Sequence, residues 1–403
     1  MTLSEELSWR GFVNQTTFGD IKALDKPLTF YWGVDPSSDS MTIGNLALAM
    51  MVRHFIDHGH KAILLVGGAT GMIGDPDGKN EERDLKSLEE IQKNKDGIAA
   101  QYRRIFAGQD FEIVDNYDWF KGLGYLDFLR EVGKHFSMTQ LLDREFVQSR
   151  IGKDGKGISY AEFSYSLIQG YDFLHLFRKK GATLQVAGAD QWGNSIAGVE
   201  LIRKLEGKTA HIWTGPLVIN TSTGMKFGKT EGGAVWIDPN KTSVFDFYQF
   251  WLNVDDAGAP QYLKFYTLLS QEEIKHLEQE TKQSPKNRAA QKKLAYEVTK
   301  IVHGKAQADA AKQATEQLNG ADTAINNDMI PILSVGQSDE LNIIKVLVDA
   351  KLATGQSDAK RLVSQGGVRF KDLKITDQFE PIRGEGLLQV GKRRFLRIQR
   401  KSD

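Results

Sequence analysis

The first half of the chain alternates between compact apolar runs of strand length and longer segments with helical periodicity. Apolar runs occur at 61–66, 183–188 and 217–220, and helical periodicity covers 45–58 and 85–106. Strands that alternate with helices favour a parallel sheet covered by helices on both faces, with ligands bound at the carboxyl ends of the strands. We therefore expect an α/β fold whose first domain is Rossmann-like.

The pattern changes after about residue 242, where helical patterns follow one another without strand-like runs and predict an all-helical domain. These patterns cover residues 245–252, 259–269, 271–282 and 285–314. A stretch rich in Gly, Asn, Asp and Ser at 319–337 is typical of a linker. Two short helices and two strand-like segments are expected after it, at 342–352, 357–365, 367–371 and 387–399.

Composition narrows the class of protein. With 403 residues, of which 40% are hydrophobic and 26% charged, the chain can form about two or three folded domains. It has no cysteine, which excludes disulfides, thiolate metal sites and a cysteine nucleophile. No apolar run approaches the roughly 18 residues of a membrane span, and the N-terminus does not resemble an export signal. We therefore expect a cytoplasmic protein with no membrane partner.

The net charge of zero conceals an asymmetry. Residues 341–403 contain 14 Lys and Arg against 7 Asp and Glu, and the rest of the chain carries the compensating negative charge. A small basic module on an acidic body favours a polyanionic partner that binds at one end. A charged segment that only keeps the protein in solution is the alternative.

The turn 35–40 is a candidate phosphate-binding site. It follows an aromatic strand and precedes an amphipathic helix, which Asp39 or Ser40 is expected to cap. The free N–H groups and the dipole at the N-terminus of a helix suit a phosphate. Gly44, in the first turn of that helix, would let a flat ring lie against the backbone. An ordinary capped helix is the alternative.

The Gly-rich segment 67–78 follows the apolar run 61–66 but matches neither familiar phosphate loop. Its glycines at 68, 71 and 74 lack the G-x-G-x-x-G spacing, and Ile73 and Asn80 stand where a Walker loop needs Gly and then Ser or Thr. The segment still offers backbone that a ligand can approach closely.

A polar stripe is predicted on the helix expected at 162–178. Tyr165, Gln169 and Asp172 lie at i, i+4 and i+7, which places them at about 0°, 40° and −20° around the helix axis. Most of the remaining circumference is apolar, so the helix should be buried and its stripe should face an internal pocket. Such a stripe could hold an ammonium group and a second polar group of a small ligand. A solvated stripe on a surface helix is the alternative.

Two further segments carry polar groups that suit a nucleotide. Asp190 and Asn194 follow the apolar run 183–188, a position where side chains commonly receive sugar hydroxyls, although a polar turn that caps the next helix would look the same. Lys226 and Lys229 lie among glycines and would form a cationic loop able to close over phosphates. An exposed turn is the alternative for this loop.

Histidine gives one apparent metal pair, because His54 and His58 lie at i and i+4. No carboxylate or thiolate motif accompanies them. We therefore expect a solvated helix end and no protein-bound metal.

Taken together and in order, these segments resemble one family, the bacterial-type tyrosyl-tRNA synthetases, which are class I aminoacyl-tRNA synthetases. The likeness extends over nearly the whole chain. The matching motifs are Tyr31-x-Gly-x-Asp35-Pro, Gly67-Gly-Ala-Thr-Gly71-x-Ile-Gly-Asp75-Pro, Asn116-Tyr-Asp-Trp119, Tyr165-x3-Gln169-x2-Asp172, Asp190-Gln-Trp-Gly-Asn194, Lys226-Phe-Gly-Lys-Thr230 and, as the opening of an S4-type module, Asp358-Ala-Lys-Arg-Leu-Val-Ser-Gln-Gly-Gly-Val368.

The resemblance implies a domain order and a reaction. It implies a Rossmann-like catalytic domain at 1–220 with a dimer-forming insertion at about 115–160, a mobile lysine loop and helical anticodon-side domain at 221–320, a linker at 321–340 and an S4-like RNA-binding domain at 341–403. The implied enzyme is a tyrosine–tRNA ligase that works as a homodimer. It would use ATP, with Mg²⁺ carried by the nucleotide, to form tyrosyl-adenylate and would then transfer tyrosine to the 3′ end of tRNA(Tyr).

The resemblance also implies roles for individual residues. For tyrosine it implies Tyr31 and Asp172 at the phenol, Asp75, Tyr165 and Gln169 at the amino group, and Gln191. For ATP it implies Gly33, Asp35, Ser37, Gly44, Asn45, Gly188, Asp190, which would bind the ribose, and Lys229. For catalysis it implies Thr42, Asn45, Lys79, Arg83, Lys226, Lys229 and Thr230.

One motif departs from the pattern. Where most relatives have His-Ile-Gly-His, this chain has Thr42-Ile-Gly-Asn45. The same tetrapeptide is usual in tryptophanyl-tRNA synthetases, which makes that enzyme one alternative. A non-catalytic RNA-binding protein on the same scaffold is another. We expect Thr42 to lower the rate of adenylate formation modestly without a change of specificity.

Overall fold

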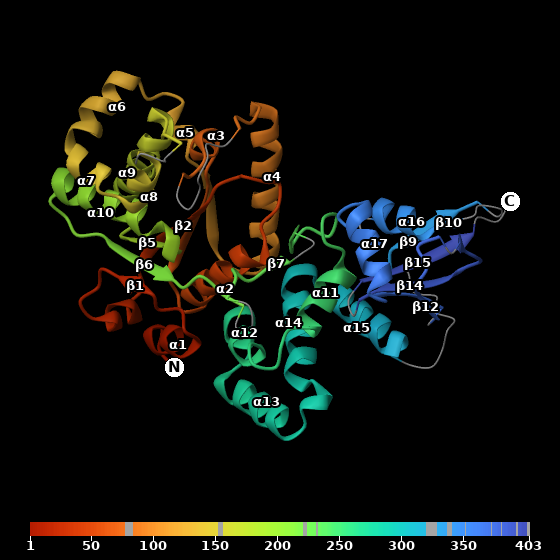
Figure 1. Cartoon of the computed structure of the whole chain (residues 1–403). Coiled ribbons are helices and arrows are strands. Elements are labelled where there is room, and N and C mark those ends of the chain that lie inside the picture. The colour runs from red at the N-terminus through yellow and green to blue at the C-terminus, as the bar shows by residue number, and fades with distance from the viewer. Residues whose placement is uncertain are drawn as a thin grey trace. The chain divides into compact units, whose positions relative to one another are not determined.

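The chain divides into two compact units, Met1–Ile219 and Asn220–Asp403. The computed structural model in Figure 1 describes residues 1–76, 84–151, 156–220, 224–230, 233–319, 329–336, 341–350, 352–371, 373–379, 381–391 and 394–400. Among the helices of these residues, none is long and apolar enough to cross a membrane.

A six-stranded sheet of order β1-β6-β5-β2-β3-β4 forms the centre of the first unit. Its strands are β1 Gln15–Thr16, β2 Thr29–Val34, β3 Lys61–Val66, β4 Phe111–Asp115, β5 Leu184–Gly188 and β6 His211–Gly215. β2 to β6 are parallel, and only the short β1 pairs antiparallel, with β6. The expected α/β fold with a parallel sheet is confirmed.

Helices cover both faces of this sheet. The main ones are α1 Leu3–Arg10, α2 Ile43–Asp57, α3 Thr70–Ile73, α4 Leu88–Ile105, α9 Tyr160–Lys180 and α10 Trp192–Glu206. On one face, Tyr31 of β2 packs in a cluster with Phe173 of α9 and Leu201 of α10. On the other face, the ring of Phe30 lies 5.2 Å from that of Phe55 on α2, and the ring of Trp32 lies 5.4 Å from that of Tyr102 on α4. Successive side chains of β2 thus pack against the helices on opposite faces of the sheet.

The helix α9 has clear start and stop signals. Ser159 and Glu162 form a capping box, and Gly181, at φ 69°, ends the helix in the left-handed conformation. α9 packs closely on α10, since a Cβ on Gly198 would lie 2.8 Å from Cβ of Phe173. Four short helices precede α9, namely α5 Tyr117–Phe120, α6 Tyr125–Glu131, α7 Met138–Leu142 and α8 Glu145–Ile151.

The second unit begins with the short strands β7 and β8 and the helices α11 to α15, and it ends in a smaller α+β part. These first elements are β7 Lys229–Thr230, β8 Gly233–Ala234, α11 Val244–Leu252, α12 Ala259–Tyr266, α13 Gln271–Gln283, α14 Ala289–His303 and α15 Lys305–Asn319. The single helix predicted at 285–314 is wrong. Gly304, at φ 89° and ψ 163°, separates α14 from α15, and its extended backbone cannot continue a helix.

The α+β part contains a five-stranded sheet of order β12-β11-β14-β15-β9 and a two-stranded pair, β10-β13. Its elements are β9 Ile332–Val335, β10 Leu341–Asn342, α16 Ile343–Asp349, α17 Gln356–Ser364, β11 Val368–Phe370, β12 Leu373–Ile375, β13 Pro381–Ile382, β14 Gly386–Val390 and β15 Arg394–Arg400. The segment expected to be strand-like at 387–399 is two strands, β14 and β15, that pair antiparallel. Gly391, at φ 63°, follows the first of them and permits the reversal.

Two local predictions in the first unit are wrong. The strand expected at 217–220 lies earlier, as β6, because Pro216 follows its last residue and cannot donate to a sheet ladder. The N-cap of α2 is Thr42, two residues beyond Ser40. The helix therefore starts later than the Asp and Ser residues of the turn suggested.

Candidate active site

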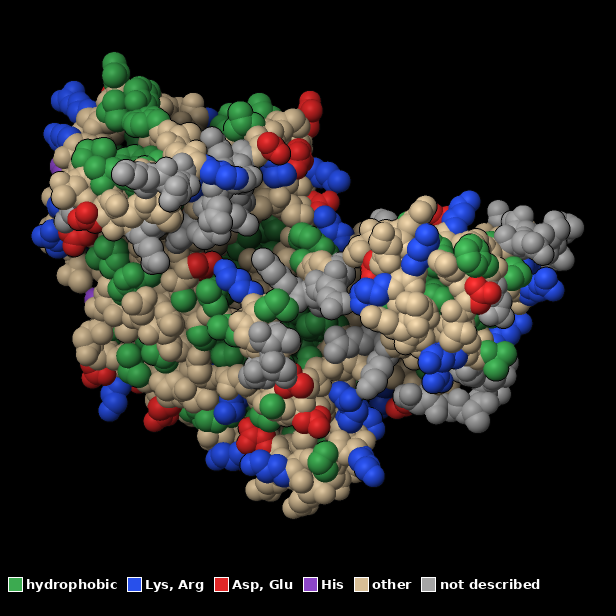
Figure 2. Space-filling model, in the orientation of Figure 1, with side chains coloured by type: hydrophobic (Ala, Val, Ile, Leu, Met, Phe, Trp, Pro, Cys, Tyr) green, Lys and Arg blue, Asp and Glu red, His purple; other side chains and the backbone are tan. Residues whose placement is uncertain are grey.

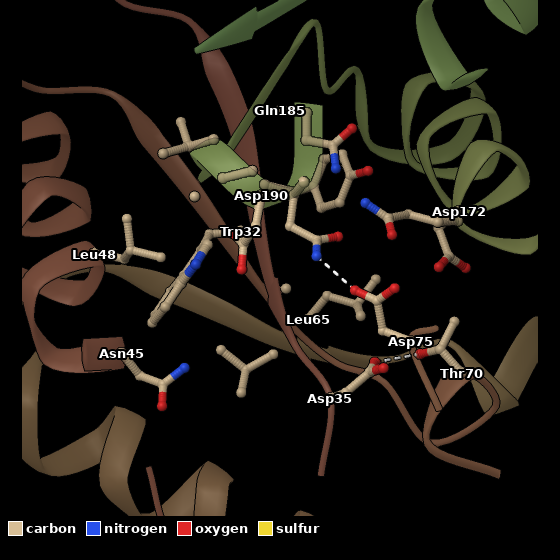
Figure 3. Close-up of a pocket in the computed structure, with 18 of the residues that line it drawn as sticks. Trp32, Asp35, Asn45, Leu48, Leu65, Thr70, Asp75, Asp172, Gln185 and Asp190 are labelled. Carbon is tan, nitrogen blue, oxygen red and sulfur yellow. Dashed lines mark hydrogen bonds between the residues drawn. The ribbon is translucent and has the colours of Figure 1, made fainter. Parts of the chain in front are cut away.

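A cavity of about 230 Å³ lies in the first unit, where the strands β2 and β5 end. Figure 3 shows Asp172, Asp75 and Thr70 on one side of it and Asn45 and Leu48 on the opposite side. The predicted site residues that line it are Tyr31, Gly33, Asp35, Ser37, Asn45, Asp75, Tyr165, Gln169, Asp172, Gly188, Asp190 and Gln191. Residues from five separate sequence segments thus meet around one cavity.

The Asp172 carboxylate lies at the buried end of the cavity, with its side chain 2% exposed. Its Oδ2 accepts a hydrogen bond from Nδ2 of Asn116 at 3.1 Å, and its Oδ1 accepts one from Nε1 of Trp119 at 2.9 Å. Burial raises the pKa of Asp172 to about 8, although the two donors oppose this rise. The carboxyl group is therefore poised to exchange a proton close to neutral pH.

The Tyr31 hydroxyl belongs to the same end of the cavity. It is buried and has no hydrogen-bond partner among the described residues. Burial, and then the charge of Asp172, raises the pKa of this phenol well above its usual range. Tyr31 therefore keeps its proton and presents a donor that a ligand in the cavity could satisfy, and an unpaired buried hydroxyl is costly.

A chain of hydrogen bonds connects Asp172 to the middle of the cavity. Asn116 Nδ2 also donates to Oγ1 of Thr70 at 3.1 Å, and this hydroxyl donates to Oδ1 of Asp35 at 2.6 Å. Oδ2 of Asp35 accepts from the hydroxyl of Tyr165 at 2.6 Å. Two carboxylates of the site are thus fixed by one shared network.

Asp75 and Gln191 form a second polar pair. Nε2 of Gln191 donates to Oδ2 of Asp75 at 2.6 Å (Figure 3). Asp75 follows α3, while Gln191 precedes α10. The pair therefore joins two segments that the chain separates by more than a hundred residues, and both of its side chains line the cavity.

The N-terminus of α2 meets the cavity through Asn45. Oδ1 of Asn45 accepts from the backbone N–H of Thr42 at 3.0 Å and from its hydroxyl at 3.1 Å. These two bonds use the carbonyl oxygen of the Asn45 amide, so its Nδ2 is the group left to donate to a ligand. Thr42 and Gly44 do not line the cavity and lie beside Asn45 in the chain.

The lysine loop, which comprises residues 226–230, belongs to the second unit. Phe227, between the two predicted lysines, is buried, and its ring stacks on that of Tyr262 at 4.1 Å. The rings of Phe250, Trp251 and Tyr266 lie at 5.4, 5.7 and 5.9 Å from it. Lys226 is exposed.

Four other predicted residues are described less fully or not at all. Lys229 and Thr230 form β7, and only their backbone belongs to the described residues. Lys79 and Arg83 lie outside the described residues.

The interpretation of His54 and His58 as a solvated helix end is wrong. His54 is 3% exposed, with Nδ1 3.3 Å from Oε1 of Glu6, and Nε2 of His58 lies 3.4 Å from Oε2 of the same carboxylate. Arg10, which is also buried, pairs with Glu6 at 2.9 Å. The histidines thus dock α1 onto α2. No group of three His, Asp or Glu side chains in the described part of the chain is arranged to bind a metal.

Four cavity-end residues received no role from sequence reasoning: Thr70, Asn116, Trp119 and Gln185. Gln185 is buried in the lining, and its Oε1 has no partner among the described residues. Its strand position opposite Tyr31 could have indicated it, because the two are register partners. Asn116 and Trp119 stand in a motif that was noticed, but nothing local connects them to Asp172.

The sequence of the chain matches that of known proteins over most of its length. Residues 22–319 match the family described as tRNA synthetases class I (W and Y). A tyrosine–tRNA ligase from Limosilactobacillus fermentum is 42% identical over 390 residues, which cover 94% of this chain and 92% of that protein.

Solved structures give the same result. A C-terminally truncated mitochondrial tyrosyl-tRNA synthetase from Aspergillus nidulans is 30% identical with a TM-score of 0.71, over 79% of this chain and 94% of its own. A tryptophanyl-tRNA synthetase from Encephalitozoon cuniculi, 14% identical over 77% of this chain and 89% of its own, has a TM-score of 0.56 and shares the fold alone. The chain is therefore an aminoacyl-tRNA ligase and belongs to the class I tRNA synthetases, within them to the tyrosine–tRNA ligase family.

Proposed function

We propose that the chain activates L-tyrosine with ATP and transfers the tyrosyl group to the 3′ end of tRNA(Tyr). The observation that carries this proposal is the pairing of Tyr31 and Asp172 at the buried end of the cavity. The Tyr31 hydroxyl donates to the phenolic oxygen of the substrate, and the phenolic O–H donates to Asp172. Phenylalanine offers neither group, so it would leave the buried Tyr31 hydroxyl unpaired and Asp172 with only the donors Asn116 and Trp119.

The remaining polar side chains fit the amino acid backbone and the nucleotide. Asp75, Tyr165 and Gln169 hold the substrate ammonium group, and Gln191 keeps Asp75 in place through its 2.6 Å hydrogen bond. Asp190 receives the ribose hydroxyls of ATP. These groups line the cavity together with Gly33, Asp35, Ser37 and Gly188, which would contact the nucleotide between the tyrosine end and α2. Gly44, which does not line the cavity, would contribute from its place beside Asn45 in the chain.

The first step is an in-line displacement at phosphorus. A carboxylate oxygen of tyrosine forms a bond to the α-phosphorus of ATP, the bond from that phosphorus to the bridging oxygen breaks, and pyrophosphate leaves with the electron pair. The attacking carboxylate is already ionised and needs no general base, so catalysis consists of positioning and charge stabilisation.

Donors and cations stabilise the leaving phosphates in this proposal. Asn45 and Thr42 at the N-terminus of α2 face the nucleotide, as the free Nδ2 of Asn45 supports. Lys226, Lys229 and Thr230 of the lysine loop, together with Lys79 and Arg83, neutralise pyrophosphate. Mg²⁺ arrives with the nucleotide, and we propose no metal bound by the protein itself.

The second step uses the tRNA. The 3′-terminal ribose hydroxyl forms a bond to the tyrosyl carbonyl carbon, the bond from that carbon to the phosphate oxygen breaks, and AMP leaves with the electron pair and takes up the hydroxyl proton on its phosphate. We propose that the S4-like domain at 341–403, with its net charge of +7, contacts tRNA phosphates. The helical domain at 221–320 would face the anticodon side, with 321–340 as the linker. We propose that the enzyme works in the cytoplasm.

We also propose a homodimer formed through the insertion at about 115–160 of the catalytic domain, which spans 1–220. Five large hydrophobic side chains of this segment are exposed by 47–77%, and we call them the insertion patch: Tyr125, Leu126, Met138, Ile151 and Tyr160. The hydroxyls of Tyr125 and Tyr160 are 3.2 Å apart, so α6 and α9, which begin at these two residues, contribute to one surface. Figure 2 shows hydrophobic side chains gathered over this part of the first unit. A second copy is the occupant that we propose for this exposed apolar patch.

The test of function is ATP–pyrophosphate exchange with tyrosine, tryptophan and phenylalanine in parallel, without tRNA. Exchange that depends on tyrosine alone is the expected result. Exchange with tryptophan would instead identify the chain as a tryptophanyl-tRNA synthetase. Exchange with none of the three would favour an RNA-binding protein on this scaffold.

The test of the dimer is sedimentation of Leu126→Glu, with Leu373→Glu as a matched control. Leu373 is 75% exposed, close to the 77% of Leu126, but belongs to the other unit. We expect a dimer for the wild type and the control and a monomer for Leu126→Glu. The proposed interface would be refuted if the wild type is a monomer or if Leu126→Glu is still a dimer.

A further inference from the structure

The helix α4 lies against the turn that precedes α2. Three of its residues, Asn94, Gly97 and Gln101, lie at i, i+3 and i+7 and so share one face. Each of the three meets the turn 36–41 at close range. Two of them are amides in buried positions, at 4% and 5% exposure.

The amides bind the backbone and one hydroxyl of the turn. Nδ2 of Asn94 donates to the carbonyl of Pro36 at 3.0 Å. Oε1 of Gln101 accepts from the backbone N–H of Met41 at 2.8 Å, and its Nε2 donates to Oγ of Ser40 at 3.0 Å. At each end of the turn, an amide side chain of α4 therefore anchors the turn to that helix.

Gly97 lets the helix approach between these two anchors. A Cβ added there would lie 2.1 Å from the backbone oxygen of Asp39. Glycine inside a helix costs about 1 kcal/mol relative to alanine. Its presence at this position is explained by the contact, because no other residue lets α4 lie so close to the turn.

The turn carries groups of the proposed ATP site. Asp35, just before the turn, and Ser37, near its start, line the cavity, and Met41 at its end precedes Thr42, the N-cap of α2. Thr42 in turn holds Asn45. A shift of the turn would therefore move both the Ser37 side and the Asn45 side of the nucleotide pocket.

We propose that Asn94 and Gln101, with Gly97 between them, are positioning residues for the ATP half of the reaction. This inference rests on the proposed function. None of the three lines the cavity, so they act through the turn. The tyrosine end has contacts of its own, the bonds from Asn116 and Trp119 to Asp172, in which none of the three takes part.

The central experiment compares Gln101→Met with Gln92→Met. Both make the same chemical change on α4, but Gln92 is exposed, and its hydrogen bonds among the described residues are to Lys95 and Asp96 of its own helix. In tyrosine-dependent ATP–pyrophosphate exchange, Gln101→Met should lower kcat/KM for ATP by about 10- to 100-fold. The KM for tyrosine should stay within about twofold, and Gln92→Met should behave as wild type.

A role in folding alone gives a different pattern. It would change tyrosine and ATP parameters together, or lower the melting temperature with unchanged kinetics, and either result would overturn the proposal. Equilibrium dialysis with labelled tyrosine reports whether the site is folded in each variant. If Gln101→Met does not fold, Asn94→Leu and Gly97→Ala supply the same comparison, since each disturbs a different contact with the turn.

The two proposals fail in distinguishable ways. Absence of exchange in the wild-type protein refutes the proposed function. Normal wild-type exchange with no selective ATP defect in Gln101→Met, Asn94→Leu or Gly97→Ala refutes only the positioning role.

Discussion

Asp172 should make the protein less stable as the pH rises through the neutral range, and Asp172→Asn should remove this dependence. The pKa of this carboxyl is about 8 in the folded protein and 3.8 in its ordinary state. Between these values the folded state holds a proton that the unfolded state has lost. The unfolding free energy therefore falls with pH, by about 1.4 kcal/mol per pH unit.

The magnitude follows directly. From about pH 5.5 to about pH 7.5 the wild type should lose about 3 kcal/mol relative to the variant. The asparagine amide cannot satisfy both Asn116 and Trp119, because it has one acceptor where the carboxylate has two. That cost does not depend on pH, so it shifts the whole curve of the variant without changing its slope.

The assay is urea unfolding of the ligand-free protein at several pH values in this range, followed by tryptophan fluorescence, to which the first unit contributes five of the seven tryptophans. Asp118→Asn is the matched control, since Asp118 lies in the same unit and is 66% exposed. We expect no pH-dependent difference between this control and the wild type. A constant difference between Asp172→Asn and the wild type across the range would refute the buried, proton-binding carboxyl.

Three further predictions concern contacts around the site. Trp119→Phe removes the 2.9 Å donor to Asp172 and should raise the KM for tyrosine by about tenfold while the KM for ATP is unchanged in exchange kinetics. Phe227→Leu removes the ring that anchors the lysine loop and should slow adenylate formation several-fold in a rapid-quench measurement, with tyrosine affinity retained; an unchanged rate would contradict the anchor. Glu162→Gln removes a carboxylate that pairs with buried Arg150 at 2.9 Å, and denaturant titration should show a loss of about 3 kcal/mol.

The strongest sequence predictions came from periodic segments. The stripe of Tyr165, Gln169 and Asp172 could be placed on one face because a helix fixes the angle between its residues, and all three line the cavity. The same holds for the parallel sheet, whose strands are short buried apolar runs. Both inferences need only local geometry.

Contacts between distant segments could not be predicted in this way. Asn116 and Asp172 are 56 residues apart and meet where α5 contacts α9, for example through the ring of Trp119, which stacks on that of His175 at 4.5 Å. His54 looked solvated because its partner Glu6 lies on a different helix. The prediction of a single helix at 285–314 failed for a related reason, since Gly304 ends α14 although the periodic pattern of the sequence continues past it.

The hydrogen bonds from Asp172 through Asn116 and Thr70 to Asp35 also bear on how such a site can evolve. Each of these side chains serves two neighbours, so the effect of replacing one depends on what stands at the others. Double-mutant combinations along the chain should be strongly non-additive. A lineage that changes its amino acid specificity must then pass through a few permitted orders of substitution, and most single first steps are closed to it.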